Sequence, residues 1–97
     1  MDNIFEWDDS KARSNLRKHG VSFEAARLAF DDRFGVEWLD TRKDYNEERF
    51  ILIGLAAGRH LCVVYTERAD RIRIISAREA VKHEQQEYHR QNAQEEW

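Results

Sequence analysis

The stretch 50-FILIGLAAGRHLCVVYTERADRIRIISARE-79 decides the fold of this 97-residue chain. Its first two apolar runs, residues 50–55 and 61–66, are nearly continuous, which is typical of strands in the centre of a sheet. The residues between these runs include Gly58 and supply a turn. The two runs therefore predict a hairpin of buried strands.

A third strand is predicted where the segment 71-RIRII-75 follows a short turn. Side chains alternate across a strand, so Arg71 and Arg73 share one face while isoleucines fill the other. Arg68 precedes this strand and Arg78 follows it, which places four guanidinium groups within eleven residues. One face of the strand must therefore meet water or bind an anion.

A short strand and a helix are predicted at the N-terminal end of the chain. The β-prone run 4–7 stops at Asp8 and Asp9, either of which is a favourable N-cap for a helix. We expect that helix to span residues 10–19, because Gly20 is suited to the left-handed conformation that ends many helices.

A second helix, a strand and a final helix complete the predicted elements. Ser22 is placed to cap a helix from residue 23 to about residue 30, and residues 35–39 alternate as a strand. Ser76 and the glutamate three residues after it form the pattern of a capping box. We therefore expect the last helix to begin there and to end at about residue 91.

These elements predict an α+β domain with the order β-α-α-β-β-β-β-α, a mainly antiparallel sheet and helices packed on that sheet. We expect one domain over residues 1–91 and a frayed tail over residues 92–97, since the chain has no proline and no linker-like segment. A domain of this size buries one small core, which argues against a large cofactor enzyme.

The composition argues against several further classes of function. No apolar run approaches the roughly 20 residues that span a bilayer, and the N-terminus lacks the pattern of a secretion signal. We therefore expect a cytoplasmic protein with no membrane partner. The single cysteine, Cys62, has no second thiol and no adjacent histidine on a catalytic face, so we expect it in the core and expect no metal site or cofactor.

Charge is segregated along the sequence. The formal net charge is −3, but residues 11–30 carry +4 and residues 59–82 carry +3, with acidic segments around them. Phosphate binding depends on where lysine and arginine lie rather than on their sum. We expect the fold to bring the two basic blocks together on one face, where RNA binds weakly and in a salt-sensitive way.

Several side chains in these blocks and in the loop between them are suited to chemistry on a phosphodiester. Lys18 and His19 end the first helix, and histidine is the side chain that exchanges protons near neutral pH. Glu48 and Arg49 lie where a loop meets a strand, and a carboxylate there acts as a base or orients an arginine. Arg78 falls in the first turn expected for the last helix, where a cation opposes the helix dipole and indicates an anionic ligand.

Each of these positions also has a purely structural interpretation. Cations in a last helical turn are favoured by the dipole alone, and the Glu47-Glu48-Arg49 segment suits an ordinary salt bridge. The two strand arginines have Glu37 and Glu67 as cross-strand partners. Core packing is the simpler role for Trp38 and Tyr65, although an exposed aromatic side chain would stack on an RNA base.

The enzyme class that these residues favour is a ribonuclease that needs no metal. RNA carries its own nucleophile, the 2′-hydroxyl, so the protein has to supply only a base, an acid and cations that stabilise the pentacovalent phosphorane. Arginine suits the last role because it stays charged and forks around phosphate oxygens.

Three blocks of the sequence, FEWD at 5–8, KHGVSF at 18–23 and RIRIISAR at 71–78, resemble the BrnT toxin family in their order and spacing. The resemblance covers roughly residues 4–90. It implies a RelE-like fold and a ribonuclease toxin of a type II toxin–antitoxin system, which arrests growth by cutting RNA. It also implies a BrnA-type antitoxin with a ribbon-helix-helix part, so that the complex, rather than this chain, binds operator DNA.

The residues and the resemblance together lead to one favoured hypothesis, an endoribonuclease toxin. Two arginines clamp the scissile phosphate while a histidine or a glutamate moves protons, so the expected catalytic residues are His19, Glu48, Arg68 and Arg78. The RNA backbone is guided by the other cations of the motifs, namely Lys18, Arg49, Arg71 and Arg73.

Two other classes of function compete with this hypothesis. One is a catalytically silent module whose basic groove receives an acidic antitoxin segment and helps to repress an operon. The other is a direct DNA-binding protein, which is disfavoured because no predicted helix combines a basic face with a helix-turn-helix pattern.

Overall fold

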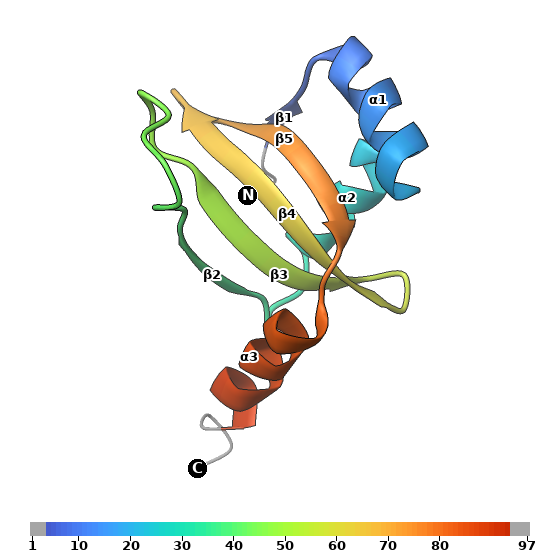
Figure 1. The fold of residues 1–97 in the computed structure, drawn as a ribbon, viewed down its shortest axis with the longest axis vertical. Coiled ribbons are helices and arrows are strands. Elements are labelled where there is room, and N and C mark those ends of the chain that lie inside the picture. Colours follow the sequence, from blue (N-terminus) through green and yellow to red (C-terminus); the bar gives the residue numbers. More distant parts are fainter. Residues whose placement is uncertain (1–3, 94–97) are drawn as a thin grey trace.

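The structure, a computed structural model, describes residues 4–93 of the chain. It confirms the predicted α+β architecture, with three helices and one five-stranded mixed sheet (Figure 1). Along the chain the elements are β1 (Ile4–Glu6), α1 (Asp9–His19), α2 (Phe23–Ala29), β2 (Val36–Leu39), β3 (Phe50–Ala56), β4 (Arg59–Arg68), β5 (Arg71–Glu79) and α3 (Lys82–Ala93). Within residues 4–93, none of these helices has the length and apolar character of a transmembrane span.

The sheet combines an antiparallel meander with one strand from the N-terminal end. Its strand order is β1-β5-β4-β3-β2. The strands β2 to β5 pair antiparallel in sequence order, whereas β1 pairs parallel with β5, with Ile4 opposite Arg71. Figure 1 shows α1 beside β5, whereas α3 extends away from the far end of the sheet.

The larger core lies on the face of the sheet that α1 and α2 cover, which we call the helical face. Phe23 is fully buried there, and the centroid of the Phe30 ring lies 5.0 Å from the centroid of the Tyr65 ring. The helix α2 approaches the sheet closely because Gly54 has no side chain; a Cβ atom at this position would lie 2.5 Å from the carbonyl oxygen of Ala29. Tyr65 is therefore a core residue, as its apolar surroundings in the sequence predict.

The opposite face, which we call the open face, is covered by α3 at one end only. Ile53 and Cys62 belong to a smaller core there, together with Tyr88 of α3. The Tyr88 hydroxyl donates a hydrogen bond to Asp32 Oδ2 at 2.7 Å, which fixes α3 to the loop before β2. The burial of Cys62 agrees with the core role expected for it.

One buried side chain, Asn15, joins α1 to the edge of β5. The strand β1 pairs only with residues 71–73, so the rest of this edge has no strand neighbour among residues 4–93. Asn15 Nδ2 donates to the carbonyl oxygens of Ala77 at 2.8 Å and Val21 at 2.9 Å, and its Oδ1 accepts from the Ala77 N–H at 3.2 Å. The amide thus takes the place of a paired strand at this position.

Replacing Asn15 by leucine should lower the free energy of unfolding by about 3 to 5 kcal/mol. The substitution leaves two carbonyls and one N–H buried without partners, and each such group costs about 1 to 3 kcal/mol. Urea unfolding measures the difference. The control is Ser14→Ala on the exposed side of the same helix, which should change stability by less than about 0.5 kcal/mol. Equal stability of Asn15→Leu and the unchanged chain would contradict this role.

The capping box predicted at Ser76 and Glu79 is wrong. The strand β5 continues through Glu79, and α3 begins only at Lys82. Pairing of this segment with β4 and the bonds between Asn15 and Ala77 stabilise extended backbone where the local sequence favours a helix start. Arg78 is therefore a strand residue, and the argument that it opposes a helix dipole does not apply.

The other predicted boundaries agree with the structure to within two residues. Asp8 and Ser22 cap α1 and α2, and Gly20 ends α1 with a φ of 71°. Residues 92 and 93, which we expected in a frayed tail, belong to α3; residues 94–97 of that tail lie outside the described residues.

Candidate functional site

The register between β4 and β5 gathers the strand arginines on the open face. Arg71, Arg73 and Arg78 lie opposite residues 68, 66 and 62, which share one face of β4 because their positions differ by two and by four. A register shift beside Val64 inserts one extra residue into β5 between Arg73 and Arg78. Strict alternation along β5 would place Arg78 on the helical face. The bulge instead places it on the open face, together with Arg71 and Arg73.

One end of the open face carries four arginines that we call the arginine cluster, namely Arg49, Arg68, Arg71 and Arg73. Glu6 contacts Arg71 at 3.4 Å and Arg73 at 3.2 Å. Glu47 contacts Arg49 at 3.1 Å and Arg68 at 3.6 Å. Because four guanidinium groups share two carboxylates, the cluster has an excess of positive charge that suits a polyanion. The cross-strand partners expected for Arg71 and Arg73, Glu37 and Glu67, are wrong, because β1 brings Glu6 to them instead.

A cleft of about 340 Å³ opens on the same face, between the end of β2 and the start of α3. We call it the His83 cleft. Its lining includes the guanidinium groups of Arg42 and Arg78, the imidazole of His83 and the indole of Trp38. Among these four residues only Arg78 is a site residue that the sequence predicts.

Arg78 is held in the cleft by a buried carboxylate. Its two terminal nitrogens donate to the two oxygens of Glu84, both at 2.9 Å, and the Val81 N–H donates to Glu84 Oε1 at 2.9 Å. Burial acts to raise the pKa of Glu84, but the bonds from Arg78 and Val81 outweigh it, so this pKa lies below its usual value. The carboxylate therefore stays ionised at neutral pH and fixes the arginine. Burial raises the pKa of the neighbouring Cys62 thiol to about 11, which leaves it protonated.

Arg42 is fixed at the mouth of the cleft in a similar way. Its Nε and one terminal nitrogen donate to the two oxygens of Asp40, both at 2.8 Å, and the hydroxyl of Tyr45 donates to the same carboxylate at 3.1 Å. The bonds from Arg42 lower the pKa of Asp40 to about 2, although burial opposes them. The Arg42 side chain is still 60% exposed, so part of its guanidinium faces solvent.

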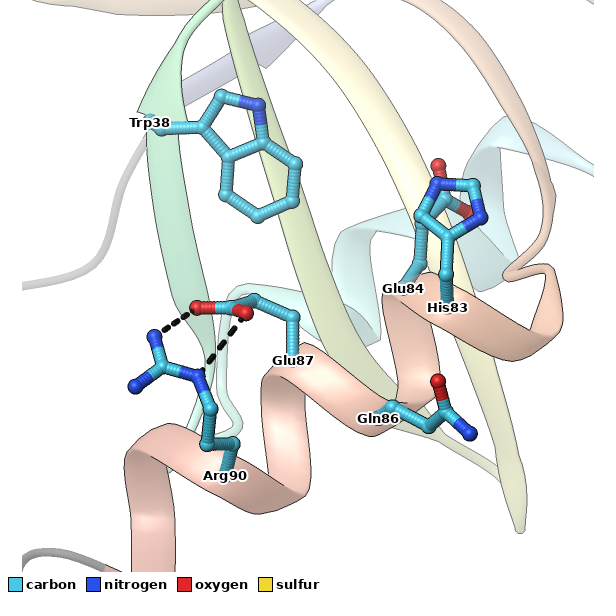
Figure 2. A pocket seen from close by; sticks show the side chains of 6 residues that line it. All are labelled: Trp38, His83, Glu84, Gln86, Glu87 and Arg90. Carbon is cyan, nitrogen blue, oxygen red and sulfur yellow. Dashed lines mark hydrogen bonds and ion pairs between the residues drawn. The ribbon is translucent and has the colours of Figure 1, made fainter.

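His83 lies in the first turn of α3 and is exposed to solvent. Figure 2 shows its imidazole next to the carboxylate of Glu84. A histidine in an open cleft exchanges protons with a substrate at neutral pH, and the neighbouring cations would hold that substrate's phosphate. No sequence motif selects His83, since its neighbours in the cleft come from β2, β5 and the loop after β2.

The expectation that the two basic blocks share one face is wrong. Lys18 and His19 are exposed at the end of α1, and α1 packs with α2 on the helical face, whereas the strand arginines lie on the open face. Within residues 4–93, no side-chain hydrogen bond or ion pair connects Lys18 or His19 to those arginines. The helix α1 lies along the β5 edge and packs Ala12 against the core of the helical face, so the end of α1 lies away from the face that carries the arginines.

Glu48 is exposed, and the adjacent Glu47 is the glutamate that contacts the arginine cluster. Glu48 contributes its main chain, whose carbonyl oxygen accepts a hydrogen bond from Thr66 Oγ1 at 2.6 Å. The salt bridge predicted for this segment therefore exists, and it joins Arg49 to Glu47. Spacing along the sequence does not distinguish two consecutive glutamates at the end of a loop.

Arg68 and Arg78 lie at opposite ends of the open face. Arg68 is opposite Arg71, and Arg78 is seven residues further along β5. At about 3.3 Å per residue, their Cα atoms are roughly 20 Å apart. The geometry favours contacts with different phosphates of a bound strand over the expected clamp on one phosphate.

A comparison with protein families connects this geometry to a function. A family model described as "Ribonuclease toxin, BrnT, of type II toxin-antitoxin system" matches residues 7–84, a segment that contains the arginine cluster and the His83 cleft. A comparison with curated proteins finds no match. Since the matched segment covers most of the chain, the chain belongs to the BrnT family of ribonuclease toxins of type II toxin–antitoxin systems.

Proposed function

We propose that this chain is an endoribonuclease that cleaves RNA in the His83 cleft without a metal, by attack of a 2′-hydroxyl on the adjacent phosphate. The family match supports ribonuclease activity in general. The observation that carries the site is that Arg42, Arg78 and His83 line one cleft on the open face.

Base catalysis and charge stabilisation each have a candidate group in this cleft. A base removes the 2′-hydroxyl proton, the 2′-oxygen bonds to phosphorus, and the bond from phosphorus to the 5′-oxygen breaks as that oxygen takes a proton from water, which forms a 2′,3′-cyclic phosphate and a 5′-hydroxyl. His83 is the base in this proposal. Arg78 and Arg42 stabilise the negative charge of the phosphorane with the N–H groups that Glu84 and Asp40 leave free.

The arginine cluster binds the RNA backbone on one side of the cut. Its far members, Arg68 and Arg71, lie about 20 Å from Arg78, whereas Arg49 adjoins the cleft, because its carbonyl oxygen accepts a hydrogen bond from the Asp40 N–H at 2.7 Å. A single strand that crosses the open face therefore contacts both the cluster and the cleft. The carboxylates Glu6 and Glu47 neutralise part of its charge. This binding is therefore weak and falls as the salt concentration rises.

In the cell, this activity arrests growth until an antitoxin binds the protein. A type II system implies a protein antitoxin and an RNA substrate. We assign the antitoxin to the BrnA type with a ribbon-helix-helix part, so that operator DNA is bound by the complex, and we place the reaction in the cytoplasm, where the RNA is.

One observation favours a second candidate function, a catalytically silent module that binds the antitoxin. Every arginine of the cluster and of the His83 cleft already contacts a carboxylate within residues 4–93. Acidic segments of a partner protein can replace the part-exposed carboxylates Glu6 and Glu47, because each exchange replaces one ion pair by another.

A cleavage assay separates the two candidates. The purified chain is incubated with a single-stranded RNA in EDTA, and with the same RNA carrying 2′-deoxyribose at the cleaved position. We expect cleavage in EDTA with a 2′,3′-cyclic phosphate end, and no cleavage at the 2′-deoxy position. A folded chain that binds its antitoxin but cuts no RNA supports the silent module, and cleavage that EDTA abolishes contradicts the metal-independent mechanism.

A further inference from the structure

A second cavity, of about 500 Å³, lies between β2 and α3 and continues the His83 cleft. The two cavities share Trp38, His83 and Glu84 as lining residues. Figure 2 shows the indole of Trp38 reaching from β2 toward α3, with the Glu87–Arg90 pair on the opposite wall. A group held in this second cavity is therefore next to any phosphate held by Arg78.

Trp38 has the exposure and position of a stacking platform. It lies on the edge strand β2, opposite Ile51 on the open face, and 36% of its surface is exposed. The expectation that Trp38 is a core residue is therefore wrong. Exposed aromatic side chains beside cationic grooves stack the unpaired bases of single-stranded RNA, because every base has a π-face.

The α3 wall of the cavity carries groups that can read the edge of a base. Glu87 accepts hydrogen bonds from Arg90, whose Nε lies at 3.1 Å, and from Gln91 Nε2 at 2.7 Å. These bonds lower the pKa of Glu87 to about 2, so it is purely an acceptor at neutral pH. Gln86, which is exposed on the same wall, adds an amide that donates and accepts.

We propose that this cavity is a nucleobase subsite, in which the base of the nucleotide next to the scissile phosphate stacks on Trp38 and is read by Gln86 and Glu87. The inference rests on the proposed cleavage of RNA in the adjoining cleft. A carboxylate that only accepts favours bases whose exocyclic amino group offers two N–H hydrogens over uracil, which offers only its N3–H, so adenine, guanine and cytosine bind better than uracil. The volume lies in the usual range of small-molecule sites and suits one unstacked nucleotide.

The test combines a spectroscopic and a binding measurement on the folded full-length chain. The probe is a single-stranded oligonucleotide with 2′-deoxyribose at the cleaved position, which binds without being cut. Its binding should quench tryptophan fluorescence in the unchanged chain and not in Trp38→Phe. Trp38→Ala should raise the Kd for this probe about tenfold or more, since stacking contributes about 1 to 3 kcal/mol per base, while Trp38→Phe should recover most of the affinity.

Leu28→Ala is the control, because Leu28 is also an exposed apolar side chain but belongs to α2 on the helical face and lines neither cavity. It should leave both quenching and Kd unchanged. Glu87→Gln should reduce the preference for amino-bearing bases over uracil in cleavage of RNA.

The outcomes separate this subsite from the proposed nuclease activity. Cleavage of RNA by a chain whose quenching, Kd and base preference do not respond to Trp38→Ala overturns the subsite and leaves the nuclease. Quenching by the oligonucleotide in a chain that cleaves nothing supports the subsite and contradicts the nuclease. Quenching by the antitoxin alone, with none by RNA, overturns the subsite in favour of a protein partner.

Discussion

Replacing Arg78 by alanine should lower the rate of RNA cleavage about a thousandfold. Arg78 is the cation that a buried carboxylate holds in the His83 cleft, with two bonds of 2.9 Å, and it pays little to reorganise when charge develops on the phosphate. Removing one such preorganised donor typically costs a factor of about 10² to 10³, and arginines that stabilise phosphoryl transition states contribute up to about 10⁵. Single-turnover cleavage of a labelled RNA measures the change.

The control for this prediction separates catalysis from folding. Arg78→Ala leaves the Glu84 carboxylate, whose side chain is 9% exposed, without its main partner, which costs about 1 to 3 kcal/mol of stability. The double substitution Arg78→Met with Glu84→Met fills the same space with apolar groups and should restore stability but not cleavage. A folded Arg78→Ala protein that cleaves RNA within fivefold of the unchanged chain would exclude Arg78 from the reaction.

Replacing His83 by alanine should lower the cleavage rate about a hundredfold and flatten its pH dependence. A positioned proton-transfer group typically contributes about 10² to 10⁴, and histidine is the side chain that changes protonation between pH 5 and pH 8. His83 is exposed in the cleft, so its removal should not disturb the core. Rates measured across this pH range, with and without added imidazole, test the role, because imidazole should partly restore activity in His83→Ala.

His89→Ala is the matched control for His83. His89 is an exposed histidine of the same helix, but it does not line the cleft. Its ring packs against His60, with the two ring centroids 5.2 Å apart. Its replacement should change the cleavage rate less than twofold. If His83→Ala retains the full rate and pH profile, the proton is moved by another group, and His19→Ala then tests the histidine that the sequence predicts.

The sequence predicts the fold well where local signals and strand pairing agree. The apolar runs 50–55 and 61–66 are buried neighbours in the sheet, and Asp8, Ser22 and Gly20 act as the helix boundaries they resemble. Where the two kinds of signal disagree, the tertiary contact wins. Ser76 begins a good capping box, yet the backbone after it stays extended because β4 and Asn15 supply its hydrogen bonds.

The candidate site was less predictable, because its parts meet only through long-range contacts. A bulge that no sequence pattern reveals decides which face Arg78 occupies. Trp38 and Arg42 belong to β2 and its following loop, and they meet His83 only after α3 has packed across the sheet. Conversely, Lys18 and His19 belong to the KHGVSF block and the strand arginines to the RIRIISAR block, and the structure places these two blocks on different sides of the sheet.

The parallel pairing of β1 with β5 determines how early the protein can fold during its synthesis. Ile4 and Arg71 are neighbours in the sheet although 67 positions separate them in the chain, so the first strand has no partner until β5 has left the ribosome. Domains dominated by such distant pairings fold slowly and late. The arginine cluster needs Glu6 and β5 together, and the His83 cleft needs α3 as well. A nascent chain therefore lacks the assembled cleft until α3 emerges, so the proposed cleavage of RNA requires α3 to have emerged and packed.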